Sequence, residues 1–362
     1  MKWSGGILCE VYNELGGEKV FIIFCKIGEY VMNDKSEDLL YLCSRIQFGA
    51  VNLSPGEKEF CDKLNIEVIS LCKSMPDSTQ TDALLFVMKY LQASFERNLN
   101  FFQYFYVPAW SIIYWLIEFG SKEKKLKQED IKNAITAHSM AMLLHPLDDQ
   151  LNDGELPVTH LSLLLRSQAW EIMTNGLKRL ADGAKSGEKI IRDFINRYYS
   201  GISSSKRIES IDEYCDGFRN EMCTWLIVPM LLTRKITANQ SFSDAILKAY
   251  ESFGIAWRLL DDIQDLEIDM FTQIHSSVYF CLPEKERRIW DKTSGRKRVD
   301  SKKNLLNYIH QNKIIDVIRA RIISELEYAA DVAYQSDMTG LANEYNGLIK
   351  TFKIEKNHGQ RK

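Results

Sequence analysis

The stretch GIAWRLLDDIQDLEID, residues 254–269, decides how the rest of the chain is interpreted. It starts as an apolar helical run and then places five acidic residues in its last nine positions. On a helix, Asp261, Asp265 and Asp269 share one face because they are four residues apart. Burying such a face is costly unless the carboxylates are paired or bind metal. The stretch therefore predicts either a solvated helix end or a metal site.

A second acidic group, HPLDDQLND at residues 145–153, has the same setting. It follows the apolar run AITAHSMAMLL and precedes GELP, which indicates the end of a helix. Asp149 and Asp153 are i,i+4 neighbours, and Asp148 lies beside them. One such group is as consistent with an exposed helix end as with a site. Two such groups together favour a Mg²⁺ site over an exposed helix end, because Mg²⁺ is typically held by a few carboxylates together with the phosphates of a substrate. A carboxylate pair acting as acid and base is the competing chemistry, but it does not require so many aspartates.

The composition is typical of a globular protein with a large core. The 362 residues are 45% hydrophobic and 26% charged, with a net charge of −3, so the overall field does not indicate a nucleic-acid partner. The eight cysteines contain no C-x-x-C pair, which fits neither a zinc site nor a disulfide framework. No secretory signal is visible at the N-terminus. We expect a cytoplasmic protein.

Apolar spacing from about residue 55 onward is helical, as in DALLFVMKYLQASFERNLNFF at residues 82–102. The first 55 residues differ, because KVFIIFCKIGEYVM at residues 19–32 fits a strand or a helical extension equally well. The polar segment WDKTSGRKRVDSKKN at residues 290–304 predicts a mobile loop. The sequence thus predicts an all-α domain of roughly ten helices at residues 56–362 and an N-terminal extension at residues 1–55.

One segment, FFQYFYVPAWSIIYWLIEF at residues 101–119, approaches the length of a membrane span. It contains Gln103, Pro108, Ser111 and Glu118, and its aromatic residues run along its whole length instead of flanking its ends. We therefore expect a pair of buried helices and no stable membrane span.

The acidic motifs resemble those of the class I isoprenoid synthase superfamily, above all the trans-polyprenyl diphosphate synthases. GIAWRLLDDIQD resembles the second aspartate-rich motif, Gly-x-x-Phe-Gln-x-x-Asp-Asp-x-x-Asp, with Trp257 for Phe and Arg258 for Gln. LLHPLDDQLNDGELPVTH at residues 143–160 resembles the first motif in its longer form. The similarity covers roughly residues 93–269 and includes DEYCDGFRNEMCTWLIVPMLL, which is similar to the helix that carries a Lys-Thr pair.

This resemblance implies an isoprenoid synthase-type helical bundle around a deep apolar pocket with both motifs at its mouth. It implies three Mg²⁺ ions that bind the diphosphate of a prenyl diphosphate substrate and assist its departure. Aromatic faces would stabilise the resulting carbocation. Family members are often homodimers. The implied metal ligands are Asp148, Asp149, Asp153, Asp261, Asp262 and Asp265.

Several basic residues of the prenyl synthases have no counterpart in this chain. GELPVTH lacks the family's Arg-Arg pair, RNEMCTW at residues 219–225 lacks the Lys-Thr pair, and the segment after the second motif is not rich in Gly and Lys. Arg97 alone can stand in for the Gly-Gly-Lys-Arg segment. In the family these groups seat the second substrate, isopentenyl diphosphate. Their loss favours an enzyme that ionises a single prenyl diphosphate.

Further roles follow from the resemblance. Asp148, Asp149 and Asp261 would act in catalysis by holding the ions. Arg219 is the candidate for the arginine that contacts the diphosphate upstream of the second motif in terpene cyclases. Arg258 either contacts the diphosphate or pairs with Asp262 one turn away. Trp225 and Trp257 would line the cation pocket.

The sequence therefore predicts a Mg²⁺-dependent class I terpene synthase. It would ionise a C15–C25 prenyl diphosphate, cyclise or deprotonate the cation, and release diphosphate. A chain-elongating trans-prenyltransferase, or one with an unusual acceptor, is the alternative within the enzymes. A non-catalytic regulatory subunit of a prenyl synthase is the alternative from another class.

Overall fold

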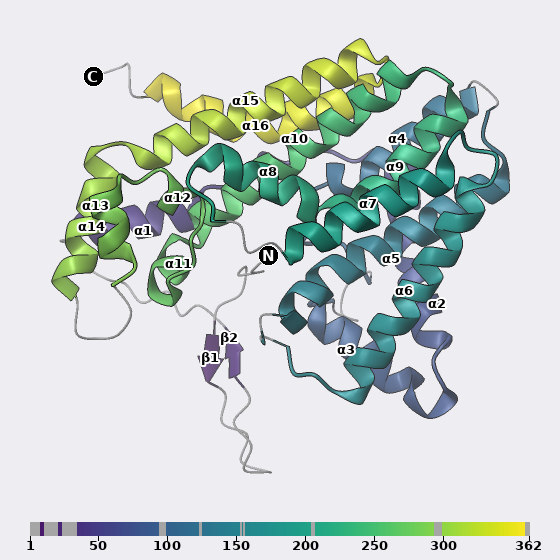
Figure 1. Ribbon diagram of the computed structural model, residues 1–362, viewed down its shortest axis with the longest axis horizontal. Coiled ribbons are helices and arrows are strands. Elements are labelled where there is room, and N and C mark those ends of the chain that lie inside the picture. Colours follow the sequence, from purple (N-terminus) through teal and green to yellow (C-terminus); the bar gives the residue numbers. More distant parts are fainter. Residues whose placement is uncertain are drawn as a thin grey trace. The chain divides into compact units, whose positions relative to one another are not determined.

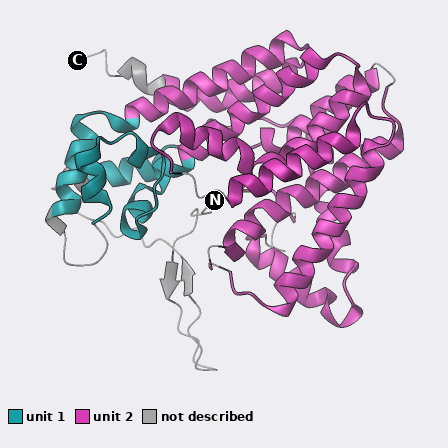
Figure 2. Ribbon diagram, viewed as in Figure 1, with its two compact units in different colours: residues 1–46, 261–315 teal, residues 47–260, 316–362 magenta. Residues whose placement is uncertain are grey.

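The computed structural model describes residues 8–10, 21–23, 35–93, 99–122, 125–152, 154, 156–203, 207–292 and 299–358. The chain divides into two compact units (Figure 2). Unit 1 contains residues 1–46 and 261–315, and unit 2 contains residues 47–260 and 316–362. The unit boundaries fall inside α10 (Gln240–Gln264) and α15 (Ile314–Gln335). The predicted domain boundary at residue 55 stays a prediction.

Unit 2 is all-α and is arranged around α5 (Figure 1). Its other elements, besides the parts of α10 and α15, are α2 (Pro55–Lys73), η1 (Asp77–Thr79), α3 (Gln80–Tyr90), α4 (Pro108–Lys122), α6 (His160–Ala181), α7 (Gly187–Ile202), α8 (Ile211–Glu221), α9 (Cys223–Ile236) and α16 (Thr339–His358). Helix α5 (Gln128–Asn152) packs against α2, α4, α6 and α9. Its residues 137–147 are all buried, which explains why apolar side chains occur on every face of this stretch.

Buried polar side chains fix α5 against its neighbours. His138 Nε2 lies 2.9 Å from the carbonyl oxygen of Ala109 in α4, and burial lowers the pKa of His138 to about 4. The imidazole is therefore neutral near pH 7 and donates through this nitrogen. Trp225 Nε1 in α9 donates to the carbonyl of Ala141 at 3.2 Å. These bonds hold the helix whose last turns carry the first acidic motif.

A buried pair of carboxyl groups joins α2, α4 and α16. Glu57 completes a capping box at the start of α2, where the Ser54 amide donates to Glu57 Oε2 at 2.8 Å. Glu344 in α16 is 4% exposed and accepts hydrogen bonds from Ser111 Oγ and Trp115 Nε1 of α4. Burial and the neighbouring Glu57 carboxyl raise the pKa of Glu344 well above its ordinary value. The environment of Glu344 therefore favours its protonated form.

Unit 1 combines a short β-ribbon with helices. Strands β1 (Leu8–Glu10) and β2 (Phe21–Ile23) pair antiparallel, with Leu8 opposite Ile23, so the structure has a strand where the sequence left strand and helix open. The helices, besides the end of α10, are α1 (Lys35–Arg45), α11 (Leu266–Thr272), α12 (Ser277–Phe280), α13 (Glu284–Trp290) and α14 (Val299–Gln311). Helix α1 packs against α11 and α14, and buried Leu39, Leu266 and Trp290 belong to this core.

The helix predicted over residues 82–102 is too long. Helix α3 ends at Tyr90, and Gln92 adopts a left-handed conformation with φ of 52° that helices do not continue through. Further on, the Phe101 amide donates to Asn65 Oδ1 at 2.7 Å, and the Phe102 amide donates to Asn100 Oδ1 at 2.9 Å. Asparagine side chains thus hold this backbone in turns, although its apolar spacing is helical.

Two other expectations need correction. Residues 101–104 form turns before α4, so the predicted helix pair over residues 101–119 is a single helix with a preceding turn segment. The predicted loop at residues 290–304 is wrong for residues 299–304, which begin α14, while residues 293–298 lie outside the described chain.

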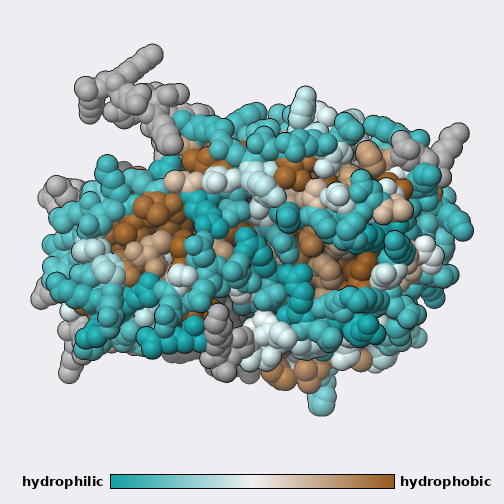
Figure 3. Space-filling model, turned by 45° about the horizontal axis from the view of Figure 1, so that its top comes forward, coloured by the Kyte–Doolittle hydropathy of each residue, from teal (hydrophilic) through white to brown (hydrophobic). Residues whose placement is uncertain are grey.

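Within the described parts of the chain, no helix combines the length and apolar character needed to cross a membrane. On the face drawn in Figure 3, hydrophilic residues dominate and hydrophobic residues gather in separate patches.

Candidate functional site

The first acidic motif forms the end of α5, as predicted. Asp148 and Asp149 lie in its last two turns and are partly exposed. The helix ends at Asn152, and Gly154 follows with a φ of 71°, which only glycine adopts readily. Asp153, the third predicted ligand of this motif, lies outside the described residues.

Asp148 is held by an arginine on the next helix. Arg166 of α6 donates through Nε and Nη2 to the two carboxylate oxygens of Asp148, at 2.7 and 3.0 Å. The Tyr198 hydroxyl of α7 lies 3.4 Å from Asp148 Oδ2. The Asp148 side chain is 13% exposed and that of Arg166 is 31% exposed. The arrangement is a bidentate, partly buried ion pair, which is the strong form of this interaction.

Sequence reasoning missed Arg166. The expected basic pair was sought in GELPVTH, and Arg166 lies six residues beyond it, in the apolar segment LSLLLRSQAW. Helices α5 and α6 pack closely against each other, so residues eighteen positions apart meet across the helix pair. A lone arginine among leucines near the start of the helix is the signal that was available.

The second acidic motif keeps the predicted helical spacing through the end of α10 and into α11. The Asp265 amide donates to the Asp261 carbonyl, and the Asp269 amide donates to the Asp265 carbonyl, both at 2.9 Å. Asp262, Asp265 and Asp269 are 3%, 4% and 4% exposed. The alternative of a solvated helix end is therefore wrong for these three residues.

Asp262 has a structural contact of its own. Its Oδ2 accepts a hydrogen bond from the backbone amide of Ser277 at 2.9 Å, at the start of α12. Neither residue is exposed. The carboxylate therefore helps to position the segment that follows the second motif, whatever else it binds.

The donor types in both motifs fit a hard divalent cation. Asp148, Asp149, Asp261, Asp262 and Asp265 supply carboxylate oxygens, which Mg²⁺ prefers to nitrogen or sulfur. Among the residues that the structure describes, no three His, Cys, Asp or Glu side chains are gathered closely enough to hold an ion. The Asp148 carboxylate is engaged by Arg166 instead. The residues fit the ion by chemistry, but their present arrangement does not form its coordination shell.

Trp225 and Trp257 belong to an aromatic cluster in unit 2. Their rings lie 5.5 Å apart between centroids, and the ring of Phe105 lies about as close to both, at 6.0 and 5.9 Å. Trp225 is fully buried and Trp257 is 5% exposed. His145 also packs against Trp225, and burial lowers the pKa of His145 to about 3. The neutral imidazole of His145 thus joins this cluster one turn before Asp148 on α5.

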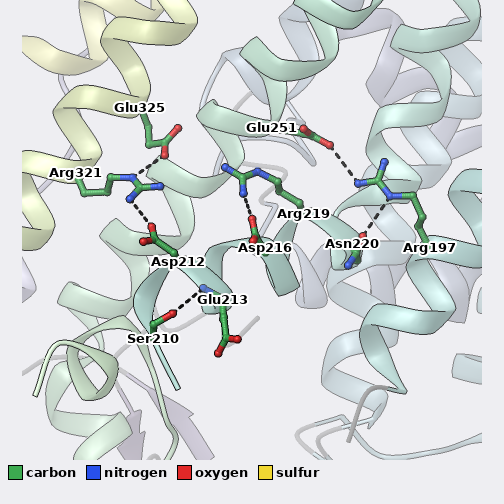
Figure 4. Close-up of polar contacts among 10 residues, drawn as sticks. All are labelled: Arg197, Ser210, Asp212, Glu213, Asp216, Arg219, Asn220, Glu251, Arg321 and Glu325. Carbon is green, nitrogen blue, oxygen red and sulfur yellow. Dashed lines mark hydrogen bonds and ion pairs between the residues drawn. The ribbon is translucent and has the colours of Figure 1, made fainter. Parts of the chain in front are cut away.

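Arg219 lines a cavity of about 590 Å³ on α8, α10 and α15. Its guanidinium pairs with Asp216 (Figure 4). The other lining residues are Lys248, Glu251, Ser252, Arg321, Ser324, Glu325 and Tyr328. Figure 4 shows Arg321 bound to Asp212 and Glu325, and Arg197 bound to Glu251. Acidic groups thus offset the basic ones here, and the predicted diphosphate contact of Arg219 stays a prediction.

The remaining basic candidates have different outcomes. Arg258 Nε donates to the Tyr214 hydroxyl at 2.6 Å, and its guanidinium lies over the rings of Tyr214 and Phe218. Its predicted pairing with Asp262 or with a diphosphate stays a prediction. Arg97 lies outside the described residues.

The sequence matches no family model and no curated protein, but the structure is similar to several solved ones. Geranylgeranyl pyrophosphate synthase from Corynebacterium glutamicum has a TM-score of 0.63 at 13% identity, over 87% of this chain and 98% of that one. The same enzyme complexed with isoprenyl diphosphate and magnesium gives 0.57 at 14% identity, over 82% and 99%. Polyprenyl synthetase from Streptomyces coelicolor gives 0.57 at 12% identity, over 80% and 98%.

These similarities cover nearly the full length of each solved structure. The implied homodimer stays a prediction. The chain has the all-α isoprenoid synthase fold, the fold of the polyprenyl and geranylgeranyl diphosphate synthases.

Proposed function

We propose that the protein is a Mg²⁺-dependent enzyme that removes the diphosphate from an allylic prenyl diphosphate. Two aspartate motifs on an isoprenoid synthase fold carry this proposal. In particular, Asp262 and Asp265 of the second motif are buried, at 3% and 4% exposure, and buried carboxylates are costly unless they are compensated.

Asp148, Asp149 and Asp153 of the first motif and Asp261, Asp262 and Asp265 of the second would hold the ions. The bound Mg²⁺ supplies electrostatic stabilisation of the departing diphosphate. The chain's own contribution is to orient these carboxylates, through contacts such as the one between Asp262 and the Ser277 amide. Trp225 and Trp257 provide ring faces whose quadrupoles favour a nearby carbocation.

Two reactions can follow ionisation. Chain elongation by transfer to isopentenyl diphosphate is supported by the solved neighbours, several of which are named as geranylgeranyl or polyprenyl synthases. Cyclisation or deprotonation of the cation is supported by the missing Arg-Arg, Lys-Thr and Gly-Lys segments. We place elongation first, because the neighbours match over almost their entire length, and keep the terpene synthase reaction as the second candidate.

Product analysis separates the two reactions. The protein is incubated with Mg²⁺ and farnesyl or geranylgeranyl diphosphate, with and without isopentenyl diphosphate. A longer prenyl diphosphate that forms only with both substrates supports elongation. A hydrocarbon or alcohol formed from one substrate supports the terpene synthase reaction and rejects elongation. No conversion under either condition would reject both reactions and favour a non-catalytic subunit.

A further inference from the structure

Arg166 and Asp148 form a contact that competes with metal binding at Asp148. Both oxygens of the Asp148 carboxylate accept from the guanidinium, at 2.7 and 3.0 Å. The guanidinium of an arginine stays charged at any pH at which the protein is folded. A divalent cation bound at the same oxygens would lie within a few ångströms of this positive charge and be repelled. Metal binding at Asp148 is therefore weaker while Arg166 holds the carboxylate, and is favoured when Arg166 moves away.

The surroundings of Arg166 allow its side chain to move away from Asp148. The Arg166 guanidinium lies over the ring of Trp170, 5.4 Å from its centroid, and the side chain is 31% exposed. The arginine therefore contacts an aromatic ring and is partly open to solvent. Its long side chain can leave the carboxylate without any change in α6, because the contact is made by the guanidinium alone.

Two tyrosines can compensate Asp148 when the arginine leaves. The Tyr198 hydroxyl already lies 3.4 Å from Asp148 Oδ2. The hydroxyl of Tyr90, at the end of α3, is buried and has no hydrogen-bond partner among the described residues. Burial, with the charge of Asp148 as a second cause, raises the pKa of Tyr90 well above its ordinary value. The Tyr90 hydroxyl is therefore a buried donor that no described residue uses.

We propose that Arg166 is a latch: it holds Asp148 away from metal in the empty protein, and on arrival of the metal and a diphosphate it releases Asp148 and pairs with the diphosphate. This inference rests on the proposed function. The planar guanidinium matches phosphate oxygens as well as it matches a carboxylate. Arg166 thus couples metal loading to substrate loading and would contact the leaving group directly.

The test measures two binding constants for the full chain with Mn²⁺ in place of Mg²⁺. The first is the Kd for Mn²⁺ alone, measured from the electron paramagnetic resonance signal of free Mn²⁺. The second is the Kd for inorganic diphosphate at saturating Mn²⁺, measured by equilibrium dialysis. The Arg166→Gln variant should bind Mn²⁺ about tenfold more tightly than wild type, because the guanidinium that competes with Mn²⁺ for Asp148 is gone. The variant should bind diphosphate about tenfold more weakly, because the guanidinium that pairs with diphosphate is gone. Each tenfold change corresponds to about 1.4 kcal/mol.

Changes of opposite sign distinguish a latch from a structural ion pair. If Arg166 has only a structural role, the Arg166→Gln variant should bind both Mn²⁺ and diphosphate more weakly than wild type. That result would overturn the latch, and so would Mn²⁺ binding that is unchanged in the variant. Arg166→Lys keeps the charge but loses the bidentate fork, so both constants should lie between those of wild type and Arg166→Gln. This conservative variant also keeps the test decisive if Arg166→Gln unfolds.

Two further variants separate the latch from the proposed function. Lys235→Gln breaks a similarly shielded ion pair, to Asp130 at the opposite end of α5, and should leave both constants at their wild-type values. Asp148→Asn should weaken Mn²⁺ binding. If it binds Mn²⁺ as wild type does, the metal assignment in the proposed function fails, and the latch fails with it. If Asp148→Asn weakens binding while Arg166→Gln does not tighten it, only the latch is overturned.

Discussion

Asp262 combines a proposed metal-binding role with a structural one. Its side chain is 3% exposed, and its Oδ2 accepts from the Ser277 amide. The Asp262→Ala variant leaves this buried amide without its acceptor, which should lower the free energy of unfolding by about 1–3 kcal/mol. Urea denaturation followed by circular dichroism measures this loss. Diphosphate release should also fall by about two orders of magnitude, the effect typical of losing one electrostatic group at a reacting centre.

Asp262→Asn is the matched control for this prediction. Its amide oxygen can still accept from Ser277, so stability should stay near that of wild type. Its charge is gone, so activity should fall as in the Ala variant. Full activity in a stable Asn variant would remove Asp262 from the set of metal ligands.

Residues of the site differ in how far the sequence predicts them. The aspartates are predicted because their spacing follows helix geometry, and the bonds from Asp265 to Asp261 confirm that spacing. Arg166 is not predicted, because its meeting with Asp148 depends on how α5 and α6 pack, which no spacing within either helix encodes. The Ser277 contact is hidden for the same reason, since it depends on the path of the chain after α11.

At the scale of elements, the Glu344 carboxyl makes the contact between α4 and α16 sensitive to pH. Its pKa is raised well above the ordinary value near 4.5. Above pH 4.5 the unfolded chain loses this proton while the folded protein keeps it, so the unfolded state binds fewer protons and stability falls as pH rises toward the raised pKa. Glu344→Gln removes this titration and should flatten the fall in unfolding free energy between about pH 5 and 8. Urea denaturation at several pH values tests this.

Glu59→Gln serves as the control for the pH series. Glu59 is an exposed residue of α2 that pairs with Lys63, which lowers the pKa of Glu59. Exposed pairs of this kind contribute little to stability. The variant should therefore keep the wild-type slope between pH 5 and 8. An unchanged slope in Glu344→Gln would show that Glu344 does not hold its proton through this range.

Element boundaries show which local signals are reliable. The end of α5 is predicted because Gly154 supplies a left-handed residue directly after an apolar helix. The end of α3 is not, because Gln92 takes a left-handed conformation that glutamine does not favour, and Asn65 in α2 holds the segment that follows. Tertiary hydrogen bonds outweigh the apolar period there.

At the scale of the molecule, the fold is preserved at very low sequence identity. The chain shares 13% identity with the Corynebacterium glutamicum synthase and still gives a TM-score of 0.63. The sequence predicts this fold from two short aspartate motifs, and the structure confirms it. The reaction is harder to predict, because the missing basic segments favour a terpene synthase while the solved neighbours support elongation.

The central claim is that the aspartates of both motifs support metal-dependent removal of diphosphate. The most direct test measures the release of inorganic diphosphate from farnesyl and geranylgeranyl diphosphate, with and without isopentenyl diphosphate. Wild type with Mg²⁺ should release diphosphate in at least one mixture, and chelation with EDTA should abolish the release. The double variant Asp148→Asn, Asp261→Asn, with one change in each motif, should release less than about 1% of the wild-type amount. Release that persists in EDTA or in the double variant, or no release by wild type from any mixture, would contradict the claim.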